Sequence, residues 1–154
     1  MKNPALTLGL ATLAFALNLA PQAAHAGIGY SFAAKSMIAA GIVDKETTVH
    51  NLNVYRQILE NIRATAASNQ FYAQRRTEIV GMINDLDSRV KSQFNDIPES
   101  MRSYSATLIS PAELNDVITT GKTAANQYKV EEVIAIADKA LLQLNEIDKS
   151  VGEI

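Results

Sequence analysis

The sequence predicts an all-α fold, an elongated antiparallel bundle of two long helices with a short N-terminal helix and a small helical appendage. Apolar residues recur at spacings of three and four over residues 48–97 and again over residues 123–150. This spacing places them on one face of a helix. Residues 48–97 also contain no proline and only one glycine, Gly81. The composition, in which alanine, leucine, isoleucine, asparagine, glutamine, glutamate and lysine dominate, favours helices.

Residues 1–26 have the features of a secretory signal peptide. Lys2 is the only charged residue of this segment, an apolar stretch covers 5–19, and Ala24-His25-Ala26 provides small residues before a cleavage site. The predicted mature chain therefore begins at Gly27, and we expect it in the periplasm or at the cell surface of a bacterium. An uncleaved membrane anchor is the alternative, but the apolar stretch is shorter than the roughly 20 residues that a span needs.

Composition and charge limit the mature chain further. Removing 26 of 154 residues leaves 128, which suits one domain with a single core over residues 27–154. The chain has 14 basic and 16 acidic residues, so loss of Lys2 gives the mature part a net charge of −3. We expect no nucleic-acid partner, because such proteins carry a basic face. The absence of cysteine excludes disulfides and a lipoprotein leader, so the fold depends on its core.

The first mature residues form an apolar segment. We expect a short helix over 27–41 that ends at Gly41. Its apolar side chains either cover the end of the bundle or form a detachable arm that docks on a neighbouring protein. The residues that we predict to bind a partner in the second case are Tyr30, Phe32, Met37 and Ile38.

The long central segment begins after Asp44, which can cap it, with Thr48 as an alternative cap. Its apolar face becomes thin between Ala66 and Arg76. The segment is either one helix of about 75 Å, at roughly 1.5 Å per residue, or it folds back near Ser68-Asn69-Gln70. We expect the continuous helix, because a tight helical hairpin usually contains glycine or proline. The expected apolar face is Leu52, Tyr55, Leu59, Ile62, Ala66, Ala73, Val80, Ile83, Val90, Phe94 and Ile97.

The aromatic residues of this region have helical spacing, which is more typical of a core than of a contact surface. Those that we expect in the core are Tyr55, Phe71, Tyr72, Phe94 and Tyr104.

The predicted appendage covers residues 98–121. Pro98 disfavours helix at the residue before it, so the long helix should end near Asn95. Ser110 and Pro111 fit the N-cap and first position of a further short helix, and Glu113 completes a capping box. The side chains of this helix expected to point inward are Leu114, Val117 and Ile118. Gly121 should end it.

The last helix is expected from about Thr123 to Ser150, with Gly152 just beyond its end. Its near-heptad stripe consists of Val130, Val133, Ile134, Ala137, Ala140, Leu141, Leu144, Ile147 and Val151. This spacing is typical of a coiled coil, and the helix should pack antiparallel to the long helix.

We predict no enzyme activity, no catalytic residue, and no cofactor or metal site. Gly121-Lys122-Thr123 resembles the end of a phosphate-binding loop, but Asp116 stands where that motif requires its first glycine. Asp85 and Asp87 resemble the start of a calcium loop, but Arg89 occupies the third ligand position.

The remaining candidate groups are also weak. His50 is the only histidine of the mature chain, which leaves too few ligands for zinc and one base for any serine nucleophile. Glu99 and the pair Glu131-Glu132 belong to predicted exposed faces, with no sign of the apolar pocket that a catalytic carboxyl group needs.

The order of segments resembles a known family. The export leader ending in Ala24-His25-Ala26 is followed by Gly27-Ile28, a short alanine-rich helix, a long amphipathic helix, a small helical insert and a long C-terminal helix. This order resembles the minor pilins, the pilus-tip subunits of bacterial type IV secretion and conjugation systems, although this chain is shorter than most of them. The resemblance implies a periplasmic, elongated helical protein that binds other protein subunits in pilus assembly, tip adhesion or cell contact. It transfers no functional residue.

Two other classes remain open. A periplasmic chaperone or adaptor would expose an apolar groove for peptides. A membrane-surface protein would place residues 30–43 on lipid, but Lys35 is the only positive charge there. The sequence does not specify the oligomeric state.

Overall fold

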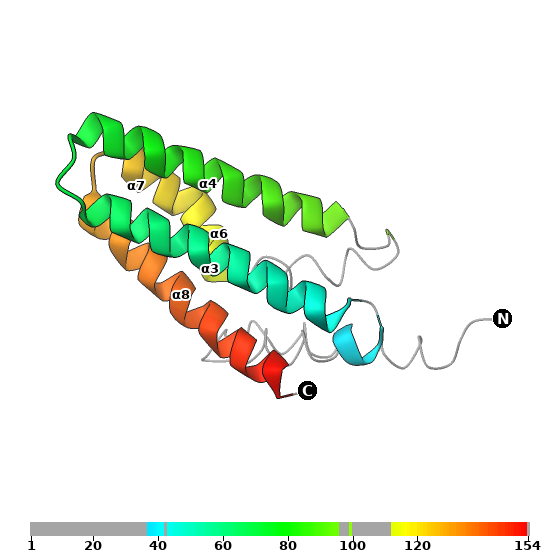
Figure 1. Ribbon diagram of the computed structural model, residues 1–154. Coiled ribbons are helices and arrows are strands. Elements are labelled where there is room, and N and C mark those ends of the chain that lie inside the picture. Colours follow the sequence, from blue (N-terminus) through cyan, green and yellow to red (C-terminus); the bar gives the residue numbers. More distant parts are fainter. Residues whose placement is uncertain (1–36, 42, 96–98, 100–111, 154) are drawn as a thin grey trace.

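The computed structural model describes residues 37–41, 43–95, 99 and 112–153, drawn as coloured ribbon in Figure 1. Within these residues the all-α prediction is confirmed, because every regular element is a helix. The elements are α3 (Lys45–Ala67), α4 (Tyr72–Asn95), α6 (Ala112–Asp116), the π-helix η2 (Val117–Gly121), α7 (Lys122–Asn126) and α8 (Val130–Gly152).

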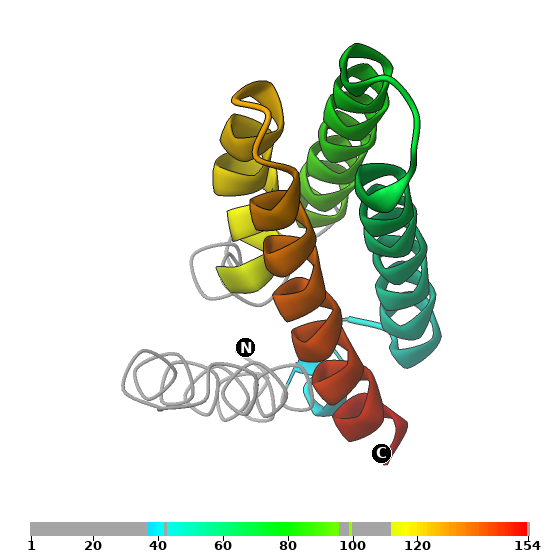
Figure 2. The same cartoon turned by 90° about the vertical axis from the view of Figure 1, so that its left-hand side faces the viewer.

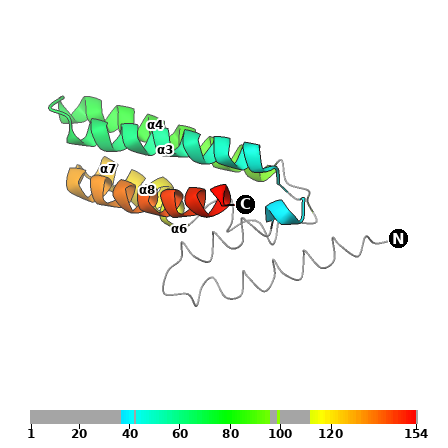
Figure 3. The same cartoon turned by 60° about the horizontal axis from the view of Figure 1, so that its bottom comes forward.

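The described helices form an up-and-down bundle. Helix α3 contacts α4 and α8, and the consecutive elements α6, η2 and α7 form one helical leg that contacts α4 and α8 on the other side. The helices α3 and α4, this leg and α8 form a ring in which each contacts the next. Figure 2 shows the bundle from its loop end, and Figure 3 shows the α3–α4 hairpin as one layer over α8 and the α6–α7 leg. The expected bundle of two long helices is therefore confirmed only in part. The long central segment forms two helices, α3 and α4, and the α6–α7 leg packs with them and α8.

The core follows from the spacing of apolar residues along each helix. Buried residues of α3, α4 and α8 alternate at steps of three and four, the pattern of left-handed helical bundles. They are Leu52, Tyr55, Leu59, Ile62 and Ala66 on α3; Ile79, Ile83, Leu86 and Val90 on α4; and Val133, Ala137, Ala140, Leu144, Ile147 and Val151 on α8. The third leg adds Leu114, Val117, Ala124 and Ala125.

The expected continuous helix over 48–97 is wrong, and the alternative that folds back at Ser68-Asn69-Gln70 is correct. Helix α3 ends at Ala67 and α4 begins at Tyr72, and the two helices pack against each other. The turn needs no glycine or proline because Ser68 itself closes α3: both its backbone N–H and its hydroxyl donate to the carbonyl of Thr65. The thin apolar face between Ala66 and Arg76 therefore marked a turn.

The buried face of α4 also differs from the expected one. The expected apolar face, which continued the stripe of α3, included Ala73 and Val80. In the structure Ala73 is exposed and Val80 is only partly buried. Ile79 and Leu86, which that stripe omitted, are fully buried. Because α4 begins as a new helix at Tyr72, the residues of its buried face cannot be found by extending the three-and-four spacing of α3 through the turn. Ile97 lies outside the described residues, as does the side chain of Phe94.

The N-terminus of α3 confirms Asp44 as the cap. Its carboxylate accepts a hydrogen bond from the backbone N–H of Thr47 at 2.9 Å and another from the Thr47 hydroxyl at 3.0 Å. These bonds hold the pKa of Asp44 below its ordinary value. Thr48, the alternative cap, lies inside the helix and donates its hydroxyl to the Asp44 carbonyl.

Of the helix expected over 27–41, the structure describes the helical residues 37–39 and their end at Gly41, as expected, with a φ of +71° that glycine adopts without strain; residues 27–36 lie outside the described residues. In contrast, Gly121 does not end the helical leg, because α7 follows η2 directly. Its backbone is right-handed, with φ −63° and ψ −40°, and it connects η2 to α7. Ala124 and Ala125 are buried beyond it, so packing against α4 and α8 outweighs the roughly 1 kcal/mol cost of glycine in a helix.

The last helix begins later than expected. The chain turns at Gln127, Tyr128 and Lys129, so α8 starts at Val130 rather than near Thr123. At the other end Gly152 belongs to the helix, and Glu153 is the C-cap, so the expected glycine end is also wrong. The helix continues to Gly152 because Val151 is fully buried in the core.

The predicted appendage over 98–121 is described only in part. Ser110, Pro111 and Tyr104 lie outside the described residues, and residues 112–121 pack into the bundle core. The backbone N–H of Glu113, at the start of α6, donates to Oε1 of Gln143 at 3.3 Å. Gln143 is the buried polar residue of α8, so a side chain from a neighbouring helix satisfies one of the free donors of α6.

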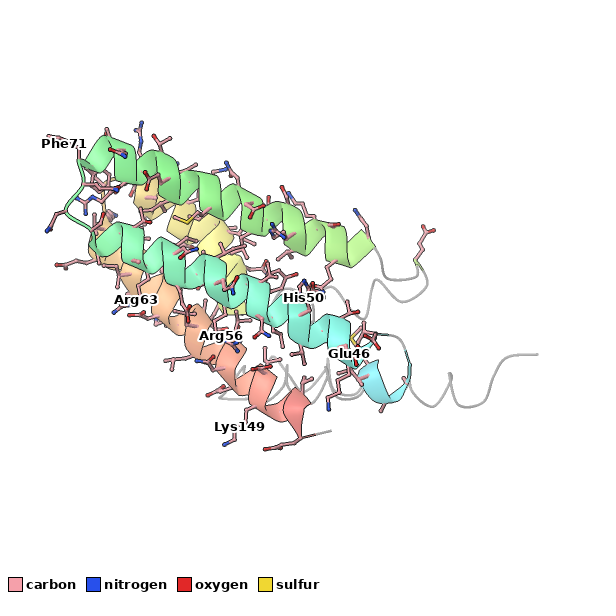
Figure 4. The ribbon with its side chains drawn as sticks, viewed as in Figure 1. Glu46, His50, Arg56, Arg63, Phe71 and Lys149 are labelled. Atoms are coloured by element: carbon pink, nitrogen blue, oxygen red, sulfur yellow. The ribbon has the colours of Figure 1, made fainter. Side chains whose placement is uncertain are left out.

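Ion pairs mark the antiparallel register of α3 and α8. Arg56 pairs with Asp148 at 3.0 Å and also donates to Asn145, while Arg63 pairs with Asp138 at 2.6 Å. Arg56 and Arg63 both lie on α3 above α8 in Figure 4. As the residue number rises along α3, the number of the partner residue falls along α8, which is the antiparallel order expected for these two helices.

Replacement of Leu59 by alanine should test the core. Leu59 is fully buried, so the variant should lose about 2–5 kcal/mol of unfolding free energy. Leu142→Ala is the matched control, because Leu142 is 66% exposed on α8 and its loss should change stability by less than about 0.5 kcal/mol. Urea unfolding followed by circular dichroism measures both. Equal effects of the two substitutions would contradict this core.

Replacement of Asp44 tests the cap and its pH dependence. Asp44→Ala should lower stability at neutral pH, and its difference from the wild type should shrink as the pH falls below about 3.9, the ordinary aspartate pKa. The sign follows from the lowered pKa of the folded state: the carboxylate stabilises the fold above the unfolded pKa, and this contribution is lost as the pH falls through the folded value. Urea unfolding at neutral pH and at about pH 3 measures it. Asp44→Asn keeps the acceptor without titrating, so it should retain stability at neutral pH.

Candidate interaction surface

Four helix ends meet at one end of the bundle. The C-termini of α3 and α7 and the N-termini of α4 and α8 lie at the left of Figure 1, joined by the 68–71 and 127–129 loops. Five side chains gather here, and we call them the loop-end surface: Phe71, Tyr72, Arg75, Arg76 and Tyr128.

The first turn of α4 holds the other helix ends in place. The hydroxyl of Tyr72 donates to the carbonyl of Ala125 at 2.9 Å, and Nη1 of Arg75 donates to the carbonyl of Ala66 at 2.8 Å. These carbonyls belong to the last turns of α7 and α3, where backbone acceptors lack helical partners and the helix dipole is negative. The first turn of α4 therefore stabilises two neighbouring helix ends.

Tyr128 has an unusual backbone conformation. Its φ is +65°, and it is the residue other than glycine with positive φ in the described part of the chain. The N–H of Lys129 donates to the carbonyl of Ala124 at 3.0 Å, and the N–H of Tyr128 donates to that of Ala125 at 3.3 Å. This is the Schellman arrangement, in which the left-handed position usually carries glycine. A tyrosine there costs backbone strain, and such strain is concentrated at functional sites.

Ring contacts connect the two loops. The rings of Tyr72 and Tyr128 lie 4.3 Å apart between centroids, at an interplanar angle of 35°. The Arg75 guanidinium carbon lies 5.2 Å from the Tyr72 ring centre, and that of Arg76 lies 5.8 Å from the Tyr128 ring centre. Both distances are within the range of cation–π attraction. Burial raises the pKa of Tyr72, and the charge of Arg75 partly offsets this rise.

The surface exposes aromatic area to solvent. Phe71 is 89% exposed, and Tyr128 is 56% exposed. In Figure 4 the Phe71 side chain extends from the outermost point of the loop, away from the bundle. The expectation that Phe71 belongs to the core is therefore wrong, while Tyr55 is buried as expected and Tyr72 is half-buried. Phe71 precedes the first residue of α4, so it has no neighbouring helix to cover it.

The arginines of this surface differ from the others that the structure describes. Arg56, Arg63 and Arg89 each form an ion pair with an aspartate. Arg75 and Arg76 have no carboxylate partner within the described ranges, and Nε of Arg75 is buried without a hydrogen bond. Their guanidinium groups contact aromatic rings and, for Arg75, a backbone carbonyl, so within the described ranges no carboxylate neutralises them in an ion pair.

The residues predicted to bind a partner lie elsewhere. Tyr30 and Phe32 fall outside the described residues. Met37 is only 3% exposed, and Ile38 packs partly buried against the same core. These two side chains cover part of the bundle, and the choice between a covering segment and a docking arm depends on residues before them.

The motifs set aside from the sequence have ordinary structural roles where they are described. Lys122, in the segment that resembles a phosphate loop, donates to Asn84 on α4 at 2.8 Å. Asp85 and Asp87 each pair with a basic residue four positions later on α4, at 3.0 Å and 2.8 Å. Glu131 and Glu132 are exposed. No group of three potential ligands that could hold a metal ion occurs among the described residues.

His50 lies at a shallow pocket of about 210 Å³ between α3 and α4. Tyr55 and Arg89 also line this pocket. The Tyr55 hydroxyl donates to Oε1 of Gln93, and burial raises the pKa of Tyr55 to about 12. His50 is exposed, and the pocket brings no second group to it that would make a general acid–base pair.

Comparisons with known proteins give no relative: no family model, no curated protein and no solved structure matches this chain. None of the helices in the described ranges combines the length and apolar character that a bilayer crossing requires.

Comparison of two substitutions should test the strained position. Tyr128→Ala and Tyr128→Gly both remove the ring, but glycine also relieves the positive φ. Tyr128→Gly should therefore be more stable than Tyr128→Ala by about 1 kcal/mol. Urea unfolding of both variants at one pH measures the difference. Equal stability, or a more stable alanine variant, would show that residue 128 does not adopt the left-handed conformation.

Proposed function

We propose that this chain is an exported, non-enzymatic protein that acts by binding other protein subunits, as a minor component of a bacterial type IV secretion or conjugation pilus. Its roles would be assembly, tip adhesion or cell contact. The observation that supports binding is the loop-end surface, where exposed aromatic rings and two arginines without a described carboxylate partner gather at one end of the bundle. Tyrosine, arginine and other aromatic residues are the types enriched at protein interfaces and their hot spots.

The pilus assignment depends on the sequence. It is supported by the signal-peptide features of residues 1–26 and by the Gly27-Ile28 that follows them, which resemble minor pilins. The rest of that resemblance is reduced by the structure, because the long central segment folds as the α3–α4 hairpin. A helical rod with contact groups at its end suits end-to-end assembly, because a subunit in a filament must offer a surface at its tip.

Non-enzymatic action is part of this proposal. Asp85 and Asp87 are engaged in ion pairs on an exposed helix face, and His50 lacks a catalytic partner in its pocket. General acid–base catalysis needs such groups to be brought together around a substrate.

A periplasmic chaperone or adaptor is the alternative. Such a protein needs a continuous apolar groove, whereas Leu142 is the large exposed apolar residue outside the loop-end surface in the described ranges. Leu142 lies twelve residues into α8, about 18 Å along the helix from its start. The described surface therefore favours contact at one end over capture of peptides along the bundle.

Localisation and transfer assays in the source bacterium should test this function. We expect the chain, detected by antibody, to sediment with pili sheared from cells, and deletion of its gene to lower plasmid transfer or secretion until the gene is restored. Pull-down from the periplasm should retain a pilus subunit. A chain found free in the periplasm, with pili and transfer unchanged by deletion, would contradict the pilus role and favour the adaptor.

The N-terminal segment needs its own variant in this assay. Deletion of residues 27–43 also removes Met37 from the core, so reduced binding could reflect lost stability. Phe32→Ala in the full chain avoids this complication. Loss of the pilus subunit with unchanged urea unfolding would assign docking to the arm, whereas unchanged capture would leave binding to the rest of the bundle.

A further inference from the structure

We infer that the loop-end surface binds a protein segment that carries carboxylates beside an apolar side chain. This inference rests on the proposed function, because it names the chemistry of the partner that an interaction protein would bind. It is drawn from three features of the surface: arginines without a described carboxylate partner, an exposed phenylalanine, and an ordered framework of ring contacts and hydrogen bonds beside them.

The charge of the surface requires an anionic partner. Arg56, Arg63 and Arg89 each form an ion pair with an aspartate. Arg76 instead has its guanidinium over the Tyr128 ring and forms no ion pair with a carboxylate of the described residues. A guanidinium offers five donors in a planar fork that matches a carboxylate. Arg76 can therefore receive a carboxylate without first breaking an ion pair.

Phe71 determines the apolar part of the partner. Its side chain is 89% exposed at the outermost loop, where a lone ring gains by burial against an aliphatic or aromatic side chain. Phe71 and Arg75 are joined by the first turn of α4, since the N–H of Arg75 donates to the Phe71 carbonyl at 3.1 Å. The exposed ring and the guanidinium groups thus belong to one short stretch, within reach of a single peptide segment.

The framework is ordered before binding. Tyr72 is fixed to Ala125, Arg75 to Ala66, and the Tyr72 and Tyr128 rings contact each other. Side chains held in this way lose little conformational freedom when a partner binds. A left-handed Tyr128 presents its ring beneath Arg76, and this gives the strained residue a role in the surface.

A peptide selection should test the inference on the chain recovered after expression with its own leader. A random peptide library displayed on phage is selected on the immobilised chain, and the most enriched peptide is synthesised with a fluorophore. We expect enriched sequences to combine aspartate or glutamate with aliphatic or aromatic residues. The counterpart peptide with asparagine and glutamine in place of the acids should bind at least about tenfold more weakly, as expected for lost charge-assisted bonds.

Variants of the chain then locate the binding. Arg76→Gln and Phe71→Ala should each weaken binding of the selected peptide about tenfold in fluorescence anisotropy. Arg89→Gln is the charge-matched control: it removes one arginine charge from the same helix, α4, near the opposite end, and should leave affinity unchanged. Phe71 is exposed and Arg76 has no ion pair, so urea unfolding should show that both test variants remain folded. Arg75 is not substituted, because it also closes α3.

Several results would overturn the inference. These are the absence of any enriched acidic peptide, affinity unchanged in Arg76→Gln and Phe71→Ala, or an equal loss in Arg89→Gln. Binding of phosphatidylglycerol vesicles or a single-stranded oligonucleotide that depends on Arg76, without peptide binding, would assign the surface to lipid or nucleic acid instead. Failure of the pilus assays with peptide binding intact would contradict only the proposed function, so the two failures are distinguishable.

Discussion

The antiparallel packing of α3 on α8 is the constraint on which the described structure depends. Both helices carry apolar residues at alternating steps of three and four, and Ala137 and Ala140 on α8 allow the helices to approach closely. The ion pairs of Arg56 and Arg63 lie beside this packing and are partly exposed, so they add less than the apolar contacts. With no cysteine in the chain, burial of these stripes must offset the entropy of ordering the helices.

The parts of the fold that the sequence predicted correctly are local. Asp44 caps α3 because its carboxylate reaches an N–H three residues later, and the stripes of α3 and α8 follow from helical periodicity. The turn at 68–71 combines the local cap of Ser68 with Arg75 of α4, which donates to a carbonyl of α3, and the end of α7 is held by Tyr72 of α4. No glycine or proline marks either place. A prediction from local sequence patterns therefore treated α3 and α4 as one helix, and α7 and α8 as another.

The loop-end surface was missed for the same reason. In a continuous helix Phe71 and Tyr72 would belong to a helical pattern of aromatic residues. The turn instead places Phe71 in solvent and Tyr72 against the end of α7. Tyr128 gives no sign of its positive φ, because tyrosine rarely adopts it. The signal that could have located the surface is the thin apolar face between Ala66 and Arg76, since a face without core residues is a place where the chain can reverse.

The ring order of the helices has a kinetic consequence. Helices next to each other in sequence are also neighbours in space. The contact between α8 and α3 differs, because it joins helices that are far apart in sequence and closes the ring. Contacts between sequence neighbours form quickly, whereas closing a long loop carries an entropic cost. Folding should therefore be limited by the docking of α8 on α3. Until then the part of the α3 stripe that α8 covers stays exposed, which makes the partly folded chain a substrate for proteases and chaperones.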